Sequence, residues 1–98
     1  MGFNTELLHG TKTGDPVTGA TLTPVYQSSA FFQPSAEQHE KLFHNKAAGY
    51  SYTRINNPTI AAFEERMTVL EKGVASVACA SGMAAITNAL MNIVGSGD

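Results

Sequence analysis

The clearest alternation of apolar and polar positions follows Asn57-Pro58. Apolar side chains recur there three and four residues apart, at Ile60, Phe63, Met67 and Leu70. That spacing is typical of a helix with one buried face. Asn57 suits the N-cap and Pro58 the first helical position, while Gly73 suits the end of the helix. Together these positions predict an amphipathic helix from residue 58 to about residue 72.

Three further elements are predicted around this helix. Ser35 and Gln38 have the spacing of a capping box, which predicts a helix from residue 36 to about residue 46. The small and apolar run 74–80 predicts a short buried strand. Ser81-Gly82 then turns the chain into a helix over 83–94, whose apolar positions again have helical spacing. The last four residues form a turn.

The first 34 residues contain four glycines and three prolines, with no helical stripe. We expect an irregular arm there, extended over 21–29, and a loop or bent strand over 47–57. The order helix, strand, helix in the second half indicates an α/β fold. A single strand forms no sheet, so the sequence looks like part of a larger architecture. We divide it into an arm with a short helix, 1–57, and the beginning of an α/β domain, 58–98.

Charge narrows the range of partners. Charged residues make up 14% of the 98 residues and the net charge is -2, where an average globular chain has about 25% charged residues. A basic excess that could hold nucleic acid or an anionic membrane is lacking, so we expect neither partner. The low charge instead predicts burial against other protein. With no secretory signal, no membrane span and a single cysteine, Cys79, expected to be buried and inert, we predict a cytoplasmic protein.

Two segments could bind a phosphate group. Ser81, Gly82 and Met83 lie where a strand opens into a helix, and free backbone N–H groups at such a helix start attract anions. Ordinary capping of the helix by Ser81 explains the same residues and is favoured for this motif alone. In the loop that follows Gly49, Tyr52 and Arg54 offer a phenol and a guanidinium that grips phosphate. A solvated arginine beside surface tyrosines is an equal alternative, but if both segments bind one ligand, a phosphorylated cofactor is indicated.

The histidines carry less information. His39 and His44 flank Glu40, but five residues along a helix place them about 140° apart, so they do not share a metal ion. We expect structural or surface roles for them and for His9, and no metal site. Glu64-Glu65 is interpreted as an exposed charged pair.

Several motifs, in this order, resemble one family of enzymes. They are Leu7-Leu8-His9-Gly10, Thr23-Pro24-Val25-Tyr26-Gln27-Ser28-Ser29, Tyr52-Thr53-Arg54-Ile55-Asn56-Asn57-Pro58-Thr59, Leu70-Glu71-Lys72-Gly73 and Ala80-Ser81-Gly82-Met83-Ala84-Ala85-Ile86. The sequence resembles the cysteine/methionine-metabolism family of pyridoxal-phosphate enzymes along essentially its whole length. Within that family it is most similar to O-acetylhomoserine sulfhydrylases, although Met83 is common in the lyases.

The resemblance implies the N-terminal segment of a fold-type I pyridoxal-phosphate-dependent transferase: the arm plus the start of its large domain. It further implies a homo-oligomer, a dimer of dimers whose active sites are shared across subunits, acting on a small amino-acid substrate. Ser81, Gly82 and Met83 would bind the cofactor phosphate of their own subunit. Tyr52 and Arg54 would reach the phosphate of the neighbouring subunit.

The family's Schiff-base lysine, in a Ser-x-Thr-Lys setting, is missing. The four lysines lie in other settings, at Lys12, Lys41, Lys46 and Lys72. We therefore expect no catalytic residue in this segment and no activity from it alone. The activity implied for the whole protein is replacement of the acetate of O-acetylhomoserine by sulfide, giving homocysteine. Alternatives are methionine γ-lyase and cystathionine γ-synthase or γ-lyase. A different class is a non-catalytic truncated subunit that completes a partner's active site.

Overall fold

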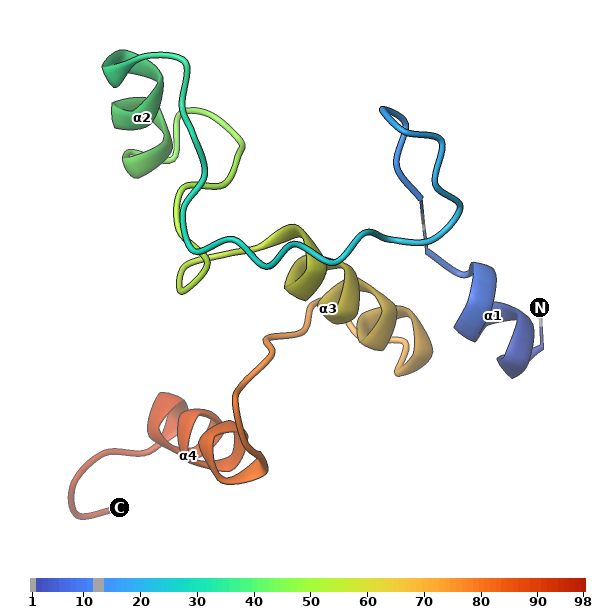
Figure 1. Ribbon diagram of the computed structural model, residues 1–98. Coiled ribbons are helices and arrows are strands. Elements are labelled where there is room, and N and C mark those ends of the chain that lie inside the picture. The colour runs from blue at the N-terminus through green and yellow to red at the C-terminus, as the bar shows by residue number, and fades with distance from the viewer. Residues whose placement is uncertain (1, 12–13) are drawn as a thin grey trace.

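The structure is a computed structural model that describes residues 2–11 and 14–98. These described residues form four helices: α1 (Phe3–His9), α2 (Ala36–Phe43), α3 (Pro58–Leu70) and α4 (Gly82–Ile93). Helix α3 lies at the centre, and the extended arm runs across its N-terminal end to α2 (Figure 1). Helix α4 lies apart from the other helices, at the end of an extended connection.

The predicted helix starts are confirmed. Ser35, Asn57 and Ser81 each accept a hydrogen bond from a backbone N–H in the first turn of α2, α3 and α4, at 3.1, 2.8 and 3.1 Å. Two predicted ends are wrong by a few residues. Helix α2 stops at Phe43, shortly before Asn45, whose φ of 55° is left-handed. Helix α3 stops before Lys72, and this residue, rather than Gly73, takes the left-handed position.

The prediction of an irregular arm over the first 34 residues is wrong for residues 3–9. Residues 3–9 form α1, although its N-cap, Gly2, offers no side-chain hydrogen bond. Seven residues are too few to show a helical stripe, and an isolated helix of that length is unstable in water. Helix α1 packs against α3, and this tertiary contact stabilises it. The rest of the arm is extended over 21–29, as predicted.

The predicted buried strand over 74–80 is also wrong. This segment is extended, but no neighbouring chain pairs with it among the described residues, and Val74 and Val77 are exposed. Side chains of α3 hold it instead. The Glu64 carboxylate accepts a hydrogen bond from the Ala78 N–H at 2.7 Å, and the hydroxyl groups of Thr68 and Ser76 are 2.7 Å apart. Glu64 is therefore half-buried and bonded, not part of an exposed charged pair.

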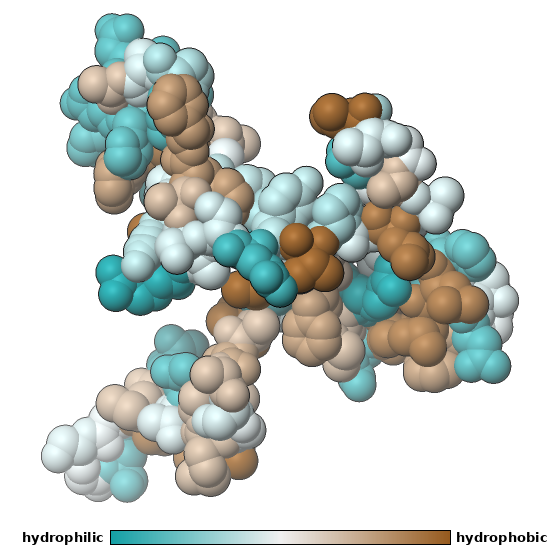
Figure 2. Space-filling view, viewed as in Figure 1, coloured by the Kyte–Doolittle hydropathy of each residue, from teal (hydrophilic) through white to brown (hydrophobic). Residues whose placement is uncertain are grey.

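The described residues enclose no hydrophobic core. Asn57 is the one buried side chain among them, and even the apolar face of α3 is open, with Phe63 57% exposed. The accessible surface is 8015 Å², whereas a folded monomer of 10.4 kDa exposes about 5,400 Å². The radius of gyration is 16.5 Å, against about 13 Å for a compact domain of this length. Brown, hydrophobic residues accordingly lie on the surface over α1 and the arm (Figure 2).

None of the described helices is long and apolar enough to cross a bilayer. No group of three or more histidine, cysteine, aspartate or glutamate side chains gathers within residues 2–11 and 14–98. His39 stacks on Phe43 with ring centroids 4.9 Å apart, and His44 lies 3.9 Å from the Glu40 carboxylate. Cys79, expected to be buried, is half-buried, with the Asn88 amide 3.7 Å from its sulfur.

Candidate functional site

The N-terminus of α4 presents unpaired backbone donors. Ser81 has an extended backbone, and its hydroxyl oxygen accepts from the Ala84 N–H. The N–H groups of Gly82 and Met83 lie at the first two positions of the helix, where no helical carbonyl is available to accept their hydrogen bonds. No other described residue accepts a hydrogen bond from them. Both residues are exposed, and a Cβ atom built on Gly82 would meet nothing within 4 Å. Ser81 does cap the helix, and the N–H groups of Gly82 and Met83 still have no hydrogen-bond partner among the described residues.

The loop after α2 presents the second set of donors. The Arg54 guanidinium lies over the Tyr52 ring, 5.1 Å from its centroid. Tyr52 is 39% exposed, and Arg54 is exposed with no carboxylate partner among the described residues. Behind them the turn is tight, because the N–H groups of Ile55 and Asn56 both donate to the Tyr52 carbonyl at 3.0 Å. The loop therefore offers a cation and a phenol on a bonded backbone.

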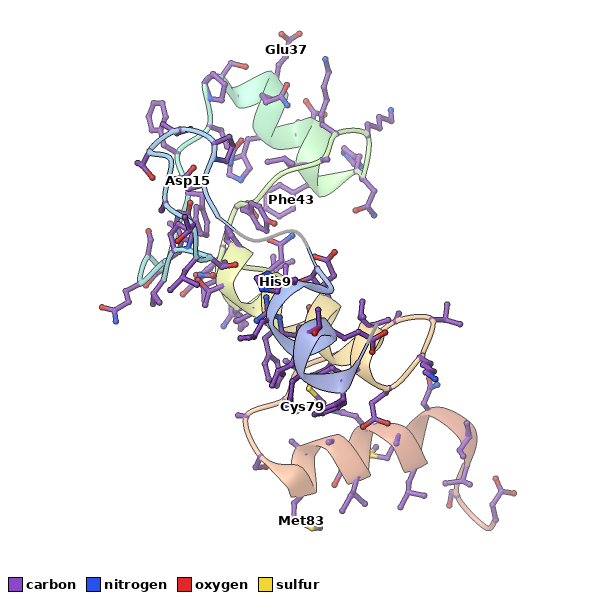
Figure 3. All side chains as sticks on the ribbon, turned by 90° about the vertical axis from the view of Figure 1, so that its right-hand side faces the viewer. His9, Asp15, Glu37, Phe43, Cys79 and Met83 are labelled. Carbon is purple, nitrogen blue, oxygen red and sulfur yellow. The ribbon has the colours of Figure 1, made fainter. Side chains whose placement is uncertain are left out.

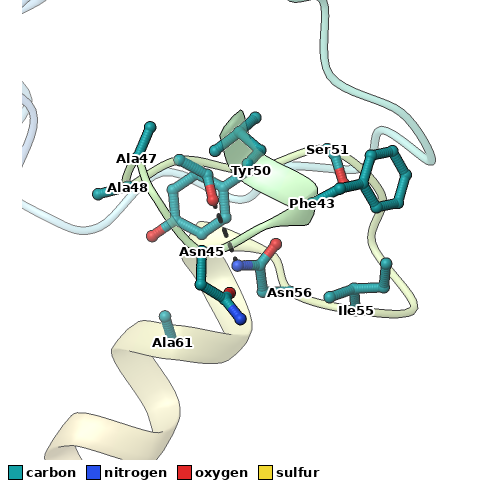
Figure 4. A pocket seen from close by; sticks show the side chains of 11 residues that line it. Phe43, Asn45, Ala47, Ala48, Tyr50, Ser51, Ile55, Asn56 and Ala61 are labelled. Carbon is teal, nitrogen blue, oxygen red and sulfur yellow. Dashed lines mark hydrogen bonds between the residues drawn. The ribbon is translucent and has the colours of Figure 1, made fainter. Parts of the chain in front are cut away.

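A cavity of about 750 Å³ lies beside this loop, lined by the end of α2, by Asn45, by residues 47–51 and by Ile55, Asn56 and Ala61. Figure 4 shows Tyr50 within it and the hydrogen bond of 3.4 Å from the Asn56 amide to the Gly49 carbonyl. The lining contains no carboxylate, imidazole or amine. The phenol of Tyr50 is the one titratable side chain in this lining.

The two donor sets do not meet within the chain. The N-terminus of α4, marked by Met83 in Figure 3, lies at the opposite end of the molecule from α2, and the loop of Tyr52 and Arg54 is drawn apart from it in Figure 1 as well. Among the described residues no hydrogen bond joins them. Each set fits an anion such as phosphate: two free N–H groups at a positive helix end, and one free guanidinium.

Sequence reasoning missed the polar contacts that hold the loop. The Asn57 amide nitrogen donates to the Tyr26 carbonyl and to the Thr53 hydroxyl, both at 3.1 Å. The Thr53 hydroxyl donates in turn to the Ser28 carbonyl. The Thr59 hydroxyl accepts from the Tyr26 N–H at 2.9 Å and donates to the carbonyl of Pro24 at 3.1 Å. The short polar side chains on both sides of the helix start were the available signal, but their partners in the arm lie more than 20 residues away.

The comparisons with known proteins define the class. Residues 4–98 match the profile of the family described as Cys/Met metabolism PLP-dependent enzyme, and the chain belongs to this family. Pyridoxal phosphate (PLP) is the cofactor of the family, so the expected cofactor is confirmed. The fold-type I architecture is confirmed as well, by the solved structures that the chain superposes on.

Particular relatives carry different activities. The chain is 44% identical over 97 residues to O-acetyl-L-homoserine sulfhydrylase of Corynebacterium glutamicum, covering 99% of this chain and 22% of that protein. It is 48% identical over 98 residues to cystathionine gamma-lyase of Bacillus subtilis, covering 100% of this chain and 24% of that protein. The chain thus spans about a quarter of the length of these relatives.

A solved structure agrees in shape. The chain superposes on a proposed O-acetylhomoserine (thiol)-lyase of Campylobacter jejuni with a TM-score of 0.89 and 31% identity, over 100% of this chain and 24% of that one. That structure carries a pyridoxyl-lysine phosphate. Lys41, Lys46 and Lys72 are exposed in the present structure, whereas Lys12 lies outside the described residues. The TM-score shows that the four helices have the same open arrangement as the corresponding quarter of that longer chain.

Proposed function

We propose that this chain forms part of a PLP enzyme of sulfur amino-acid metabolism that replaces the acetate of O-acetylhomoserine with sulfide to give homocysteine. Residues 1–57 form the arm and the loop that contacts another subunit, and residues 58–98 begin the cofactor domain. The identity of 44% to a sulfhydrylase and the TM-score of 0.89 to a thiol-lyase support this choice, whereas the identity of 48% to a cystathionine gamma-lyase supports the lyase alternative. The family motif around Tyr52 favours it too, whereas Met83, in the motif around Ser81, is common in the lyases.

The separation of the two donor sets is the observation that carries the assignment of residues. In the proposed enzyme, Ser81 and the N–H groups of Gly82 and Met83 bind the cofactor phosphate in their own subunit. Tyr52 and Arg54 bind the phosphate in the neighbouring subunit, where the exposed guanidinium finds the anion it lacks in this chain. Two half-sites on opposite parts of one chain are what a shared active site in a dimer requires, and a dimer of dimers in the cytoplasm is the proposed assembly.

When bound, PLP supplies an electron sink that lets the γ-substituent of an amino acid leave. The residues of this chain hold and orient the phosphate end, which fixes the position of the reacting end. None of them is placed to take the Schiff-base role, because no lysine stands in the family's Ser-x-Thr-Lys setting. The chain by itself is accordingly proposed to be inactive.

The substrate is decided by product analysis of the purified holoenzyme. With O-acetylhomoserine and sulfide, the proposed enzyme yields homocysteine and acetate in equal amounts. The alternatives, methionine γ-lyase and cystathionine γ-lyase, release ammonia and a 2-oxo acid from methionine or cystathionine, and a cystathionine γ-synthase joins cysteine to the activated homoserine. Ammonia release without homocysteine formation would show that the enzyme is a lyase and not a sulfhydrylase.

A non-catalytic subunit, which would complete the active site of a partner that supplies the Schiff-base lysine, is the alternative of another class. The intact mass of the natural protein, measured under denaturing conditions, separates the two functions. A mass several-fold above 10.4 kDa supports the enzyme. A mass equal to that of these residues supports a subunit that lends Tyr52 and Arg54 to a partner.

A further inference from the structure

We infer that Asn57 and Thr59 are positioning residues: they clamp the loop of Tyr52 and Arg54 onto the arm of the same chain, and thereby set how tightly the cofactor phosphate is held. The inference rests on the proposed phosphate-binding role of Tyr52 and Arg54. It adds residues whose side chains bond the arm and the loop of their own chain.

The arm is the surface against which the loop is built. Ala30 and Tyr52 form an isolated antiparallel bridge. Two backbone hydrogen bonds flank it, from the Phe31 N–H to the Ser51 carbonyl at 3.0 Å and from the Thr53 N–H to the Ser29 carbonyl at 2.7 Å. A bridge of this size is marginal in water by itself. Other contacts must therefore keep the loop in place.

Asn57 supplies such contacts from the start of α3. It is 2% exposed in a chain with no other buried side chain among the described residues. Its amide oxygen caps α3 through the Thr59 N–H, while its amide nitrogen bonds the Tyr26 carbonyl and the Thr53 hydroxyl. A cap needs only the oxygen. The amide nitrogen has a separate task, which is to tie the helix, the arm and the loop together at one point.

Thr59 completes the same clamp two residues after Asn57, in the first turn of α3. Its hydroxyl accepts a hydrogen bond from the N–H of Tyr26 and donates one to the carbonyl of Pro24. One side chain thus holds two backbone groups of the arm. Thr53, bonded to Asn57, stands between Tyr52 and Arg54 in the chain. If the arm moves, the backbone that carries Tyr52 and Arg54 therefore moves with it. Small misplacements of binding groups weaken binding strongly.

The test uses a matched pair of variants of the holoenzyme. Thr59→Val removes both hydrogen bonds to the arm without changing side-chain shape. Thr68→Val is the control, because Thr68 lies on the same helix and its hydroxyl also makes two hydrogen bonds, to the Glu64 carbonyl and to Ser76, away from the loop. We expect PLP to dissociate about five- to tenfold more readily from Thr59→Val than from Thr68→Val.

Two readouts separate positioning from general loss of stability. Binding of pyridoxal, which lacks the phosphate, should be the same in both variants. In an Arg54→Ala background, Thr59→Val should cause little further loss of PLP, because the residue it acts through is gone. Asn57→Ser is a second variant that keeps a good cap and removes the amide donor, and it should behave as Thr59→Val does.

The outcomes distinguish this inference from the proposed function. If Arg54→Ala weakens PLP binding but Thr59→Val and Asn57→Ser bind it as tightly as Thr68→Val, the positioning role is wrong and the phosphate role of Arg54 stands. Equal loss of PLP and of pyridoxal in Thr59→Val would likewise overturn positioning. If Arg54→Ala leaves PLP binding unchanged, the proposed phosphate site itself fails.

Discussion

Sharing of the active site across subunits can be tested by mixing two inactive variants. Arg54→Ala removes the proposed contact to the neighbour's phosphate. Gly82→Asp places a carboxylate where the phosphate of the same subunit is proposed to bind. Nothing lies within 4 Å of a Cβ atom at Gly82, and an acidic residue is favourable in the first turn of a helix. Gly82→Asp should therefore fold normally while it repels the cofactor.

The structure sets the expected size of each effect. Arg54 is unpaired in the described chain, so its proposed hydrogen bonds to phosphate are charge-assisted, and their loss should cost about 1.5–3 kcal/mol, or roughly ten- to a hundredfold in PLP affinity. A carboxylate about 4 Å from the phosphate, at an effective dielectric constant of about 20, adds about 4 kcal/mol of repulsion. Each variant alone should be nearly inactive at limiting PLP.

Mixing tests the geometry. In a two-fold dimer built from one subunit of each variant, one site receives the intact Gly82 of one chain and the intact Arg54 of the other, while the second site receives both substitutions. Random mixing makes about half of the dimers hybrid, so about a quarter of the sites should recover. The assay is PLP-dependent turnover after unfolding and refolding the variants together. Recovery of no activity, with hybrids demonstrated by mass spectrometry, would refute sharing between subunits.

Two further predictions concern the helix start and the exposed surface. Ser81→Ala should lower the free energy of unfolding of the holoenzyme by about 1 kcal/mol through loss of the α4 cap, whereas Ser81→Asp should keep the cap yet weaken PLP binding. Urea unfolding and PLP titration of the two variants check this. Equal PLP affinity in Ser81→Asp and the unsubstituted protein would contradict the phosphate site. The 98-residue polypeptide produced alone should show no cooperative urea transition by circular dichroism, because about 2,600 Å² more surface is open than in a compact monomer. If only half of that surface is apolar, burying the apolar half would contribute about 30 kcal/mol of free energy, several times the net stability of a domain. A sharp two-state transition of the 98-residue monomer would contradict the prediction.

The sequence by itself predicted the places where helices begin. Ser35, Asn57 and Ser81 were each identified as caps, and each accepts the expected hydrogen bond. These signals are local: a short polar side chain reaches a backbone N–H two or three residues ahead, so neighbouring residues contain all the information needed. The donors at Gly82 and Met83 follow from the same rule, since the first N–H groups of any helix lack partners. Family motifs added the cofactor, which no local rule supplies.

Tertiary structure decided the features whose partners are distant in sequence. Helix α1 has no side-chain N-cap hydrogen bond and is stabilised by packing on α3. Residues 74–80 are extended but make no strand, because pairing needs a neighbour that none of the described residues provides. The clamp at Asn57 joins residues 31 positions apart. A pattern of apolar and polar positions records which side chains prefer burial, but the partner of each is chosen only when the folded chain brings distant backbone groups within hydrogen-bonding distance.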